Sequence, residues 1–308
     1  MARLGSSRHK RRIQYIKSEM AGLRRQISTA LELAGKAEAR RVAAMPPCTP
    51  LAETEFKVYS QFGDDGIIQY LISHLPAIHS FVEFGVEDYT EANTRFLLVE
   101  NQWRGLILDG RPDLDEVLSA QGLPMLYNLE VRSAFITAEN INDLILGAGF
   151  SGEIGLLSID IDGNDYWVWK AITCVQPQIV VVEYNAVFGS ERALTIPYSP
   201  GFSRQQAHHS YLYFGASLRA LCLLAEEKGY AFVGCNGAGN NAYFVRKDLA
   251  VAFQVLPPKA GFMDGRFRES RDERGRMNRL SGPARLAAIA DLPVVDLESG
   301  RTITLRDL

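Results

Sequence analysis

The chain has few cysteines, and no two of them are spaced for metal binding or redox chemistry. Cys48, Cys174, Cys222 and Cys235 are far apart, and none belongs to a C-x-x-C motif. Dispersed thiols in a chain of 308 residues argue against a disulfide framework and against a structural zinc site. The sequence therefore predicts reduced thiols and a cytoplasmic protein.

Long apolar runs are also missing. No stretch approaches the roughly 18 apolar residues that a membrane-spanning helix requires. The basic start, residues 1–12, is followed by a segment without the continuous apolar core of a signal peptide. We therefore expect no transmembrane segment and no secretory leader.

Charge is unevenly distributed along the chain. Residues 1–45 hold eleven Lys and Arg against three Glu, a net charge of +8, which leaves −11 on the rest within a total of −3. An acidic body without a basic, aromatic-rich groove argues against nucleic acid as a partner.

The basic N-terminal segment, residues 1–45, has the pattern of a single helix. Five large apolar residues recur there at spacings of 3, 4, 3 and 4, as in the seam of a short coiled coil: Ile13, Ile16, Met20, Leu23 and Ile27. We expect this helix to join copies of the chain into a homo-oligomer, although its basic residues could instead contact an anionic polymer or a membrane surface. Closely spaced prolines mark a linker at 46–52.

Apolar strands and helices alternate through the main domain, residues 53–250. We predict strands at 80–86, 105–110, 124–131, 152–161, 177–185, 230–236 and 241–248, and helices at 91–103, 112–122, 137–149, 165–175 and 215–229. The first five strands are apolar throughout, which predicts a parallel sheet covered on both faces, and the last two form an antiparallel pair. The expected fold is a doubly wound, seven-stranded, mostly parallel α/β sheet of the Rossmann-like type. Residues 251–308 are charge-rich and are expected to form an extension or lid, helical in part.

Acidic residues gather where the predicted strands end. They are Glu83 and Asp88 at the first strand, Asp109 at the second, Asp160 and Asp162 at the fourth, and Glu183 at the fifth. Ligands of doubly wound sheets bind at this edge. Gly85 stands there without the further glycines of G-x-G-x-x-G, which disfavours NAD, FAD and ATP. Asp109 is placed to accept hydrogen bonds from both hydroxyls of a ribose.

Segments of this domain resemble the motif series of class I S-adenosylmethionine-dependent methyltransferases, in particular the FkbM-like branch. They are YSQFGDDGIIQYL, FVEFGVEDYTEANTRFLL, WRGLILDG, LLSIDIDGNDYWVWKAI and PQIVVVEYN, in this order. The resemblance covers roughly residues 56–248 and implies the methyltransferase fold with S-adenosylmethionine as cofactor.

The resemblance also implies roles for individual residues. Glu83 and Gly85 match the acid and glycine of the first motif, and Asp109 matches the ribose-binding acid. The cofactor contacts that it implies further include Gln61, Asp88, Asn128 and Asp160, with the segment from Asn128 to Val131 closing the third strand beside the adenine. The sequence departs from the family pattern at Glu87, where a second glycine is usual, and in D-I-D-G, which replaces D-V-E-G.

Methyl transfer to a hydroxyl needs a group that activates the acceptor. Candidate catalytic residues are Asp160, Asp162 and Glu183 at the strand ends and His208 in the loop after the fifth strand. The same three carboxylates offer hard oxygen ligands for Mg²⁺. Asp165 is expected to be the N-cap of the following helix.

The sequence thus predicts an S-adenosylmethionine-dependent O-methyltransferase that acts on a hydroxyl of a saccharide or related secondary metabolite, with Mg²⁺ as a candidate second cofactor. Two alternatives stay open. One is a catalytically silent methyltransferase-fold scaffold that binds through its N-terminal helix. The other is a metal enzyme that uses iron and oxygen at the same edge for hydroxylation.

Overall fold

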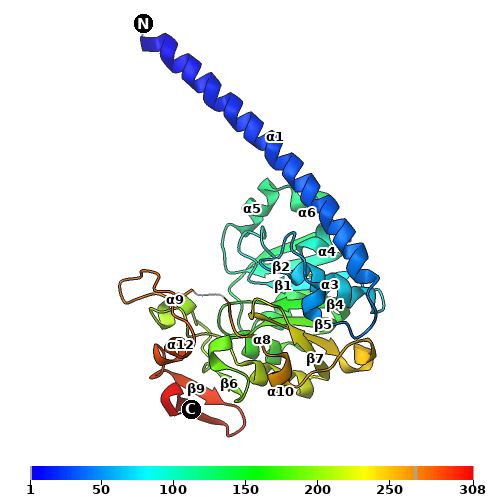
Figure 1. Ribbon diagram of the computed structural model, residues 1–308, viewed down its shortest axis with the longest axis vertical. Coiled ribbons are helices and arrows are strands. Elements are labelled where there is room, and N and C mark those ends of the chain that lie inside the picture. The colour runs from blue at the N-terminus through cyan, green and yellow to red at the C-terminus, as the bar shows by residue number, and fades with distance from the viewer. Residues whose placement is uncertain (1, 267–268, 308) are drawn as a thin grey trace.

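A seven-stranded sheet forms the centre of the molecule (Figure 1). The computed structural model describes residues 2–266 and 269–307, and for residues 2–11 it describes the backbone alone. The strand order is β3-β2-β1-β4-β5-β8-β7. The strands are β1 (Ser80–Phe84), β2 (Arg104–Asp109), β3 (Leu129–Ser133), β4 (Gly152–Ile159), β5 (Val175–Glu183), β7 (Tyr230–Cys235) and β8 (Asn241–Arg246). The first five are parallel, and β8 runs antiparallel to both β5 and β7, which confirms the predicted fold.

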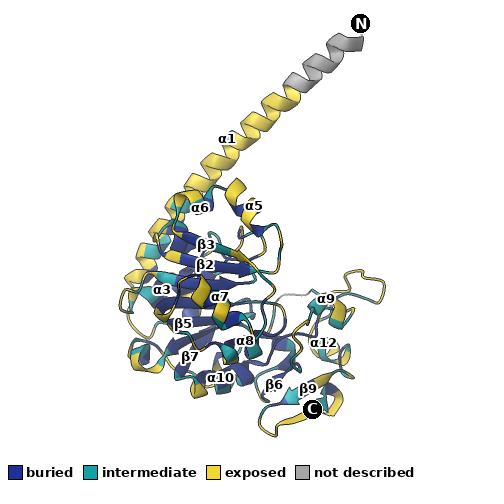
Figure 2. Cartoon of the chain, turned by 180° about the vertical axis from the view of Figure 1, so that it is seen from behind, coloured by how far each residue is buried: buried dark blue, intermediate teal, exposed yellow. Residues whose placement is uncertain are grey.

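Helices cover both faces of this sheet. The α-helices of the described residues are α1 (Ala2–Ala43), α2 (Leu51–Thr54), α3 (Asp64–Ser73), α4 (Arg95–Val99), α5 (Leu114–Ala120), α6 (Leu123–Leu126), α7 (Ile141–Gly147), α8 (Asp165–Ala171), α9 (Arg204–Ala207), α10 (Leu218–Glu227), α11 (Pro258–Gly261) and α12 (Pro283–Ala287), of which α9 and α12 lie beside the separate C-terminal cluster. Because side chains alternate along a strand, Phe81 joins the core under α3, α4 and α5, whereas Val82 and Phe84 join the core under α7, α8 and α10. The sheet is therefore buried between two hydrophobic layers (Figure 2).

The third strand differs from its predicted position. Residues 124–126, expected to be extended, lie in helix α6, and β3 begins only at Leu129. Pro124 lies in the first turn of α6, a position that proline favours because its missing N–H has no partner there in any case. Asn128 therefore precedes β3 instead of closing it, so its predicted position at the carboxyl end of this strand is wrong.

Helix α1 extends far from the body of the molecule (Figures 1 and 2). Its last turns pack on the domain, where Val42 is buried and the Lys36 ammonium lies 2.7 Å from the Glu100 carboxylate. The five apolar residues of the predicted seam are 42–60% exposed in the single chain. An apolar stripe of this kind thus faces solvent along the projecting part of the helix.

The C-terminal segment forms a second, small sheet together with a short strand that follows β5, in the order β10-β9-β6. Its strands are β6 (Leu194–Thr195), β9 (Pro293–Asp296) and β10 (Arg301–Thr304), and they pack over a separate apolar cluster. The described part of this extension, expected to be helical in part, contains the short helices α11 and α12 between strand and loop, and its strand β9 pairs with β6 in the segment that follows β5. In the described part of the chain no helix combines the length and the apolar character needed to cross a membrane.

Candidate active site

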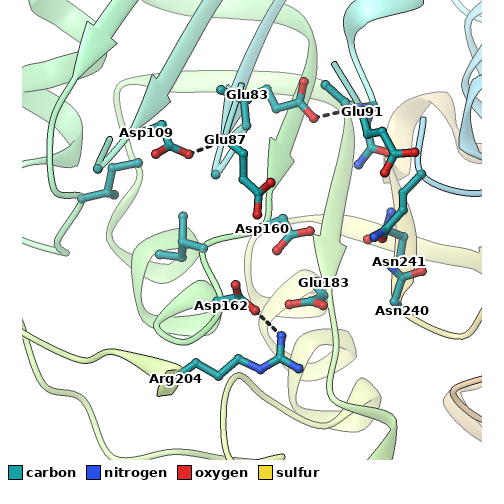
Figure 3. A pocket seen from close by; sticks show the side chains of 18 of the residues that line it. Glu83, Glu87, Glu91, Asp109, Asp160, Asp162, Glu183, Arg204, Asn240 and Asn241 are labelled. Carbon is teal, nitrogen blue, oxygen red and sulfur yellow. Dashed lines mark hydrogen bonds and ion pairs between the residues drawn. The ribbon is translucent and has the colours of Figure 1, made fainter. Parts of the chain in front are cut away.

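A cavity of about 470 Å³ opens at the carboxyl ends of β1, β2, β4 and β5 (Figure 3). Among the described residues that line it are eight carboxylates and one arginine, Arg204. The carboxylates are Glu83, Glu87, Glu91, Asp109, Asp160, Asp162, Glu183 and Glu269. A cleft lined by one sign of charge concentrates ligands of the opposite sign, so this cavity favours cations.

The loop after β1 forms one wall of the cavity and lies against the end of β4. Gly85 has φ +72°, and a Cβ atom at this position would lie 1.5 Å from the carbonyl oxygen of Asp160, so only glycine fits. Glu87 also has a positive φ, +49°, although it stands where a second glycine was expected. The loop therefore adopts a left-handed backbone at both positions.

Asp109 closes β2 and is held by backbone amides. The Glu87 N–H donates to Asp109 Oδ2 at 2.8 Å, and the Arg111 N–H donates to Oδ1 at 2.8 Å. Each carboxylate oxygen can accept a second hydrogen bond. The side chain is thus oriented at the cavity wall with acceptor capacity to spare.

Glu83 lines the cavity, but its carboxylate joins elements of the protein to one another. It accepts hydrogen bonds from the backbone N–H of Asn93 (2.9 Å) and of Thr94 (3.1 Å), from the Thr94 hydroxyl, and from the Ser158 hydroxyl (3.3 Å). The side chain is 4% exposed, and this burial raises the pKa of Glu83 to about 7 despite these hydrogen bonds. Glu83 therefore fixes the segment before α4 against β1 and β4.

Asp160, Asp162 and Glu183 form a carboxylate trio. One oxygen of each lies within 4.8 Å of the others. Burial is the main cause that raises the pKa of both Asp160 and Glu183, and repulsion by neighbouring carboxylates adds to it. Glu183 Oε2 is buried and has no hydrogen-bond partner in the described structure. The trio can therefore share a proton or hold a cation.

Arg204, from α9, supplies the positive charge of the described cavity lining. Its guanidinium pairs with Asp162 (Figure 3). The guanidinium also lies 4.0 Å from the centre of the Phe214 ring, and Arg204 Nε donates to the carbonyl oxygen of Tyr211 at 2.7 Å. These three contacts hold the Arg204 side chain in place. Because the guanidinium pairs with Asp162, it neutralises part of the negative charge of the trio.

Seven of the predicted site residues line this cavity: Gln61, Glu83, Gly85, Asp109, Asp160, Asp162 and Glu183. Three lie outside its lining. Asp88 accepts hydrogen bonds from the N–H and hydroxyl of Thr90, which lower its pKa. His208 binds the Ser210 hydroxyl through Nδ1 at 2.8 Å and lies against the His209 ring. Asn128 precedes β3, away from the carboxyl ends of the strands.

Asp165 has a different role from the predicted N-cap. Asn164 occupies the N-cap position, and Asp165 is the first residue of α8. Its fully buried carboxylate accepts hydrogen bonds from the N–H groups of Ile161 (2.8 Å) and Gly163 (2.9 Å). Burial raises the pKa of Asp165 to about 6. The side chain thus shapes the loop that carries Asp162.

Several lining residues were not predicted: Phe135, Ile136, Phe202, Arg204, Asn240, Asn241 and Glu269. Phe135 and Ile136 follow β3, so a correct position for that strand would have indicated them. Phe202 packs on Gly163, where a Cβ atom would lie 2.3 Å from its ring. The irregular sequence around Arg204 gives no periodic signal, and the prediction of an antiparallel pair of strands gave Asn240 and Asn241 no role beyond connecting and starting a strand.

The sequence matches no protein-family model and no curated protein. Solved structures similar to the chain include the N-terminal domain of EvdMO1 with SAH bound (13% identity, TM-score 0.38, 72% of this chain and 94% of that one). They also include a putative O-methyltransferase from Klebsiella pneumoniae (14% identity, TM-score 0.38, 70% of this chain and 87% of that one). A third is an S-adenosylmethionine-dependent methyltransferase from Clostridium acetobutylicum ATCC 824 (7% identity, TM-score 0.38, 59% of this chain and 89% of that one). Likenesses of this degree carry no argument about function, and the fold assignment rests on the strand order and register.

We predict that Glu83→Gln destabilises the protein most at low pH. In this variant the NH₂ group of the glutamine would face a backbone N–H of Asn93 or Thr94, which needs an acceptor. The variant therefore loses hydrogen bonds at every pH. In the native chain the raised pKa of Glu83 means that its stabilising contribution is complete below about 4.5 and is lost as the pH rises through about 7. The difference in unfolding free energy should narrow over this range by up to about 3 kcal/mol.

Urea unfolding of both proteins at pH 5 and pH 8 measures this difference. Asp115→Asn, an exposed acid on α5, is the control and should show a nearly constant, small effect. A gap between Glu83→Gln and the native chain that stays the same at both pH values would contradict the assigned pKa shift.

Proposed function

We propose that this chain is an S-adenosylmethionine-dependent methyltransferase that methylates a hydroxyl of a saccharide or related secondary metabolite. The observation that carries the proposal is the arrangement of Asp109, held by loop amides beside Gly85, across one cavity from the half-buried pair Asp160 and Glu183. Asp109 can accept hydrogen bonds from the ribose of the cofactor, and the pair Asp160 and Glu183 can remove the proton of the acceptor hydroxyl.

The cavity suits this cofactor in size, charge and wall chemistry. About 470 Å³ is within the usual range for small-ligand pockets. The acidic lining favours a sulfonium cation, and Phe135 and Ile136 offer apolar contacts near the end of β3 for a flat base. When bound, the cofactor supplies an activated methyl group for in-line displacement.

The chain's own residues then position the acceptor and take its proton. A carboxylate whose pKa is raised toward neutrality is a better general base than an ordinary one. Burial, with added repulsion from neighbouring carboxylates, raises the pKa of both Asp160 and Glu183 well above its ordinary value. We assign proton removal to this pair, and we assign to His208 no contact with the acceptor.

Calorimetry with S-adenosylhomocysteine tests cofactor binding. We expect the native chain to bind it and Asp109→Ala to weaken binding at least about tenfold, because two hydrogen bonds to a charged acceptor are lost. Asp115→Asn, an exposed acid on α5, is the control and should bind like the native chain.

The same titration separates the proposal from its main competitor. A catalytically silent protein with this fold is the second candidate, favoured by Glu87 at the position of the second glycine. If neither S-adenosylmethionine nor S-adenosylhomocysteine bound at about 1 mM, the enzyme proposal would fail. Hydroxylation with iron is less well supported, because no histidine lines the described cavity, and iron oxygenases typically use two.

We further propose that the trio Asp160, Asp162 and Glu183 binds Mg²⁺. Three carboxylates within 4.8 Å match the oxygen ligands that this ion prefers, and the unpartnered Glu183 Oε2 is one of the available donors. Arg204 competes for Asp162. The ion would lower the pKa of a bound hydroxyl and so assist proton removal.

Removal of Arg204, which competes with the ion for Asp162, and removal of the Asp162 carboxylate should therefore change the affinity for Mg²⁺ in opposite directions. We expect Arg204→Gln to tighten Mg²⁺ binding and Asp162→Asn to weaken it, each by several fold, in calorimetric titrations with the metal alone. Glu226→Gln removes an exposed carboxylate that pairs with Lys247 outside the cavity and should change nothing. Absence of Mg²⁺ binding by both the native chain and Arg204→Gln would refute the metal site.

We also propose that α1 joins two copies of the chain through its exposed stripe. A long helix without partners along most of its length is marginally stable in water, and a coiled coil would bury the stripe. In light scattering at about 10 µM, Ile16→Asp combined with Leu23→Asp should give a monomer where the native chain is a dimer. Ser18→Asp adds a charge on the opposite face and should leave the dimer intact; a monomeric native chain would disprove the proposal.

A further inference from the structure

One wall of the cavity comes from the β7–β8 hairpin, across Asp160 and Glu183 from Asp109 (Figure 3). Asn241, the first residue of β8, lies opposite Glu183 in the antiparallel register and lines the cavity. It is 4% exposed, and its Oδ1 atom is buried without a hydrogen-bond partner in the described structure. Such an atom is unusual in a folded protein and calls for a physical explanation.

The orientation of this amide is dictated by a buried acid. Asn241 Nδ2 donates to Asp64 Oδ1 at 3.0 Å. The same oxygen accepts hydrogen bonds from Asn236 Nδ2, at 2.9 Å, and from the Tyr243 hydroxyl. A carboxylate that receives three donors acts as an acceptor, so the amide of Asn241 must direct its NH₂ group toward Asp64 and its oxygen away from it.

Hydrogen bonds to the Asn236 side chain also fix the β7–β8 hairpin that carries Asn241. Asn236 Oδ1 accepts hydrogen bonds from the N–H groups of Gly239 (3.1 Å), Asn240 (3.2 Å) and Asn241 (3.2 Å). Asp64, 1% exposed, is the first residue of α3. The hairpin turn and the start of α3 are thus tied into one unit, and rotation of the Asn241 amide would break its hydrogen bond to Asp64.

We propose that Asn241, oriented by Asp64, accepts a hydrogen bond from the ammonium group in the amino-acid portion of the cofactor. This inference rests on the proposed function. Asp109 provides for the ribose at the other end of the cavity, so the amino-acid end of the elongated cofactor extends toward the hairpin. A cationic donor suits this wall better than a neutral hydroxyl, because the cavity is lined by carboxylates.

Two ligands that differ only in the amino-acid portion test the proposal by calorimetry. S-Adenosylhomocysteine contains the ammonium group, whereas 5′-deoxy-5′-methylthioadenosine has the same nucleoside and sulfur without the amino acid. Asn241→Ala should weaken S-adenosylhomocysteine about tenfold or more and leave methylthioadenosine unchanged. Asn101→Ala removes the amide of an exposed residue that exchanges hydrogen bonds with Gln69, outside the cavity lining, and should leave both affinities unchanged.

Asp64→Asn tests the orienting role and serves as the second variant where Asn241→Ala does not fold. It keeps the shape of the side chain but lets the Asn241 amide turn, so S-adenosylhomocysteine should weaken and methylthioadenosine should not. If the native chain binds both ligands and Asn241→Ala affects both equally or neither, Asn241 does not bind the ammonium group and the proposed function still stands. An unchanged affinity in Asp64→Asn overturns the orienting role of Asp64. Failure of the native chain to bind either ligand instead refutes the proposed function, and this inference with it.

Discussion

The site depends on the close approach of the loop after β1 to the end of β4. At Gly85 the two backbones are so close that a Cβ atom would overlap the Asp160 carbonyl oxygen. This contact brings the ends of neighbouring parallel strands together, and with them Asp109 on one side and the carboxylate trio on the other. The left-handed backbone at Gly85 and Glu87 then directs the Glu87 N–H toward Asp109. A single glycine thus sets the distance between the two halves of the cavity.

The buried and half-buried acids of the domain divide into structural and chemical groups according to their hydrogen bonds. Glu83, Asp65 and Asp165 each accept several backbone N–H groups, and each therefore holds a loop: the segment before α4, residues 58–60, and residues 161–163. Asp160 and Glu183 have no such donors among the hydrogen bonds of the described structure, and burial raises the pKa of both groups. Carboxylates that the protein leaves without donors are the ones available to a ligand, a proton or a cation.

The sequence predicted the sheet well because its strands are apolar and regularly spaced, and the acids at strand ends followed from the fold. The predictions from the sequence were wrong or incomplete where local interactions, and not the apolar pattern, decide the structure. Pro124 starts a helical turn and moves β3, which misplaced Asn128. Asp165 was expected to be an N-cap, yet it is the first residue of α8, and its side chain accepts hydrogen bonds from the preceding loop, an orientation that depends on tertiary burial. Arg204 reaches the cavity from a four-residue helix in an irregular segment, and no periodicity marks such a position.

The adjacent pair Asp64 and Asp65 shows why neighbouring identical residues need not share a role. They begin the same helix, but successive helical positions point in different directions. Asp65 Oδ2 holds the loop at residues 58–60, next to the lining residue Gln61, whereas Asp64 Oδ1 holds the hairpin that carries Asn241. One helix start thereby positions two walls of the cavity that are far apart in sequence. Because neither carboxylate is paired with a basic group in the described structure, the cost of burying them is offset by these donors and by the positive end of the α3 dipole. The cavity therefore keeps its shape through hydrogen bonds to buried acids, and its own carboxylates remain free to interact with a ligand.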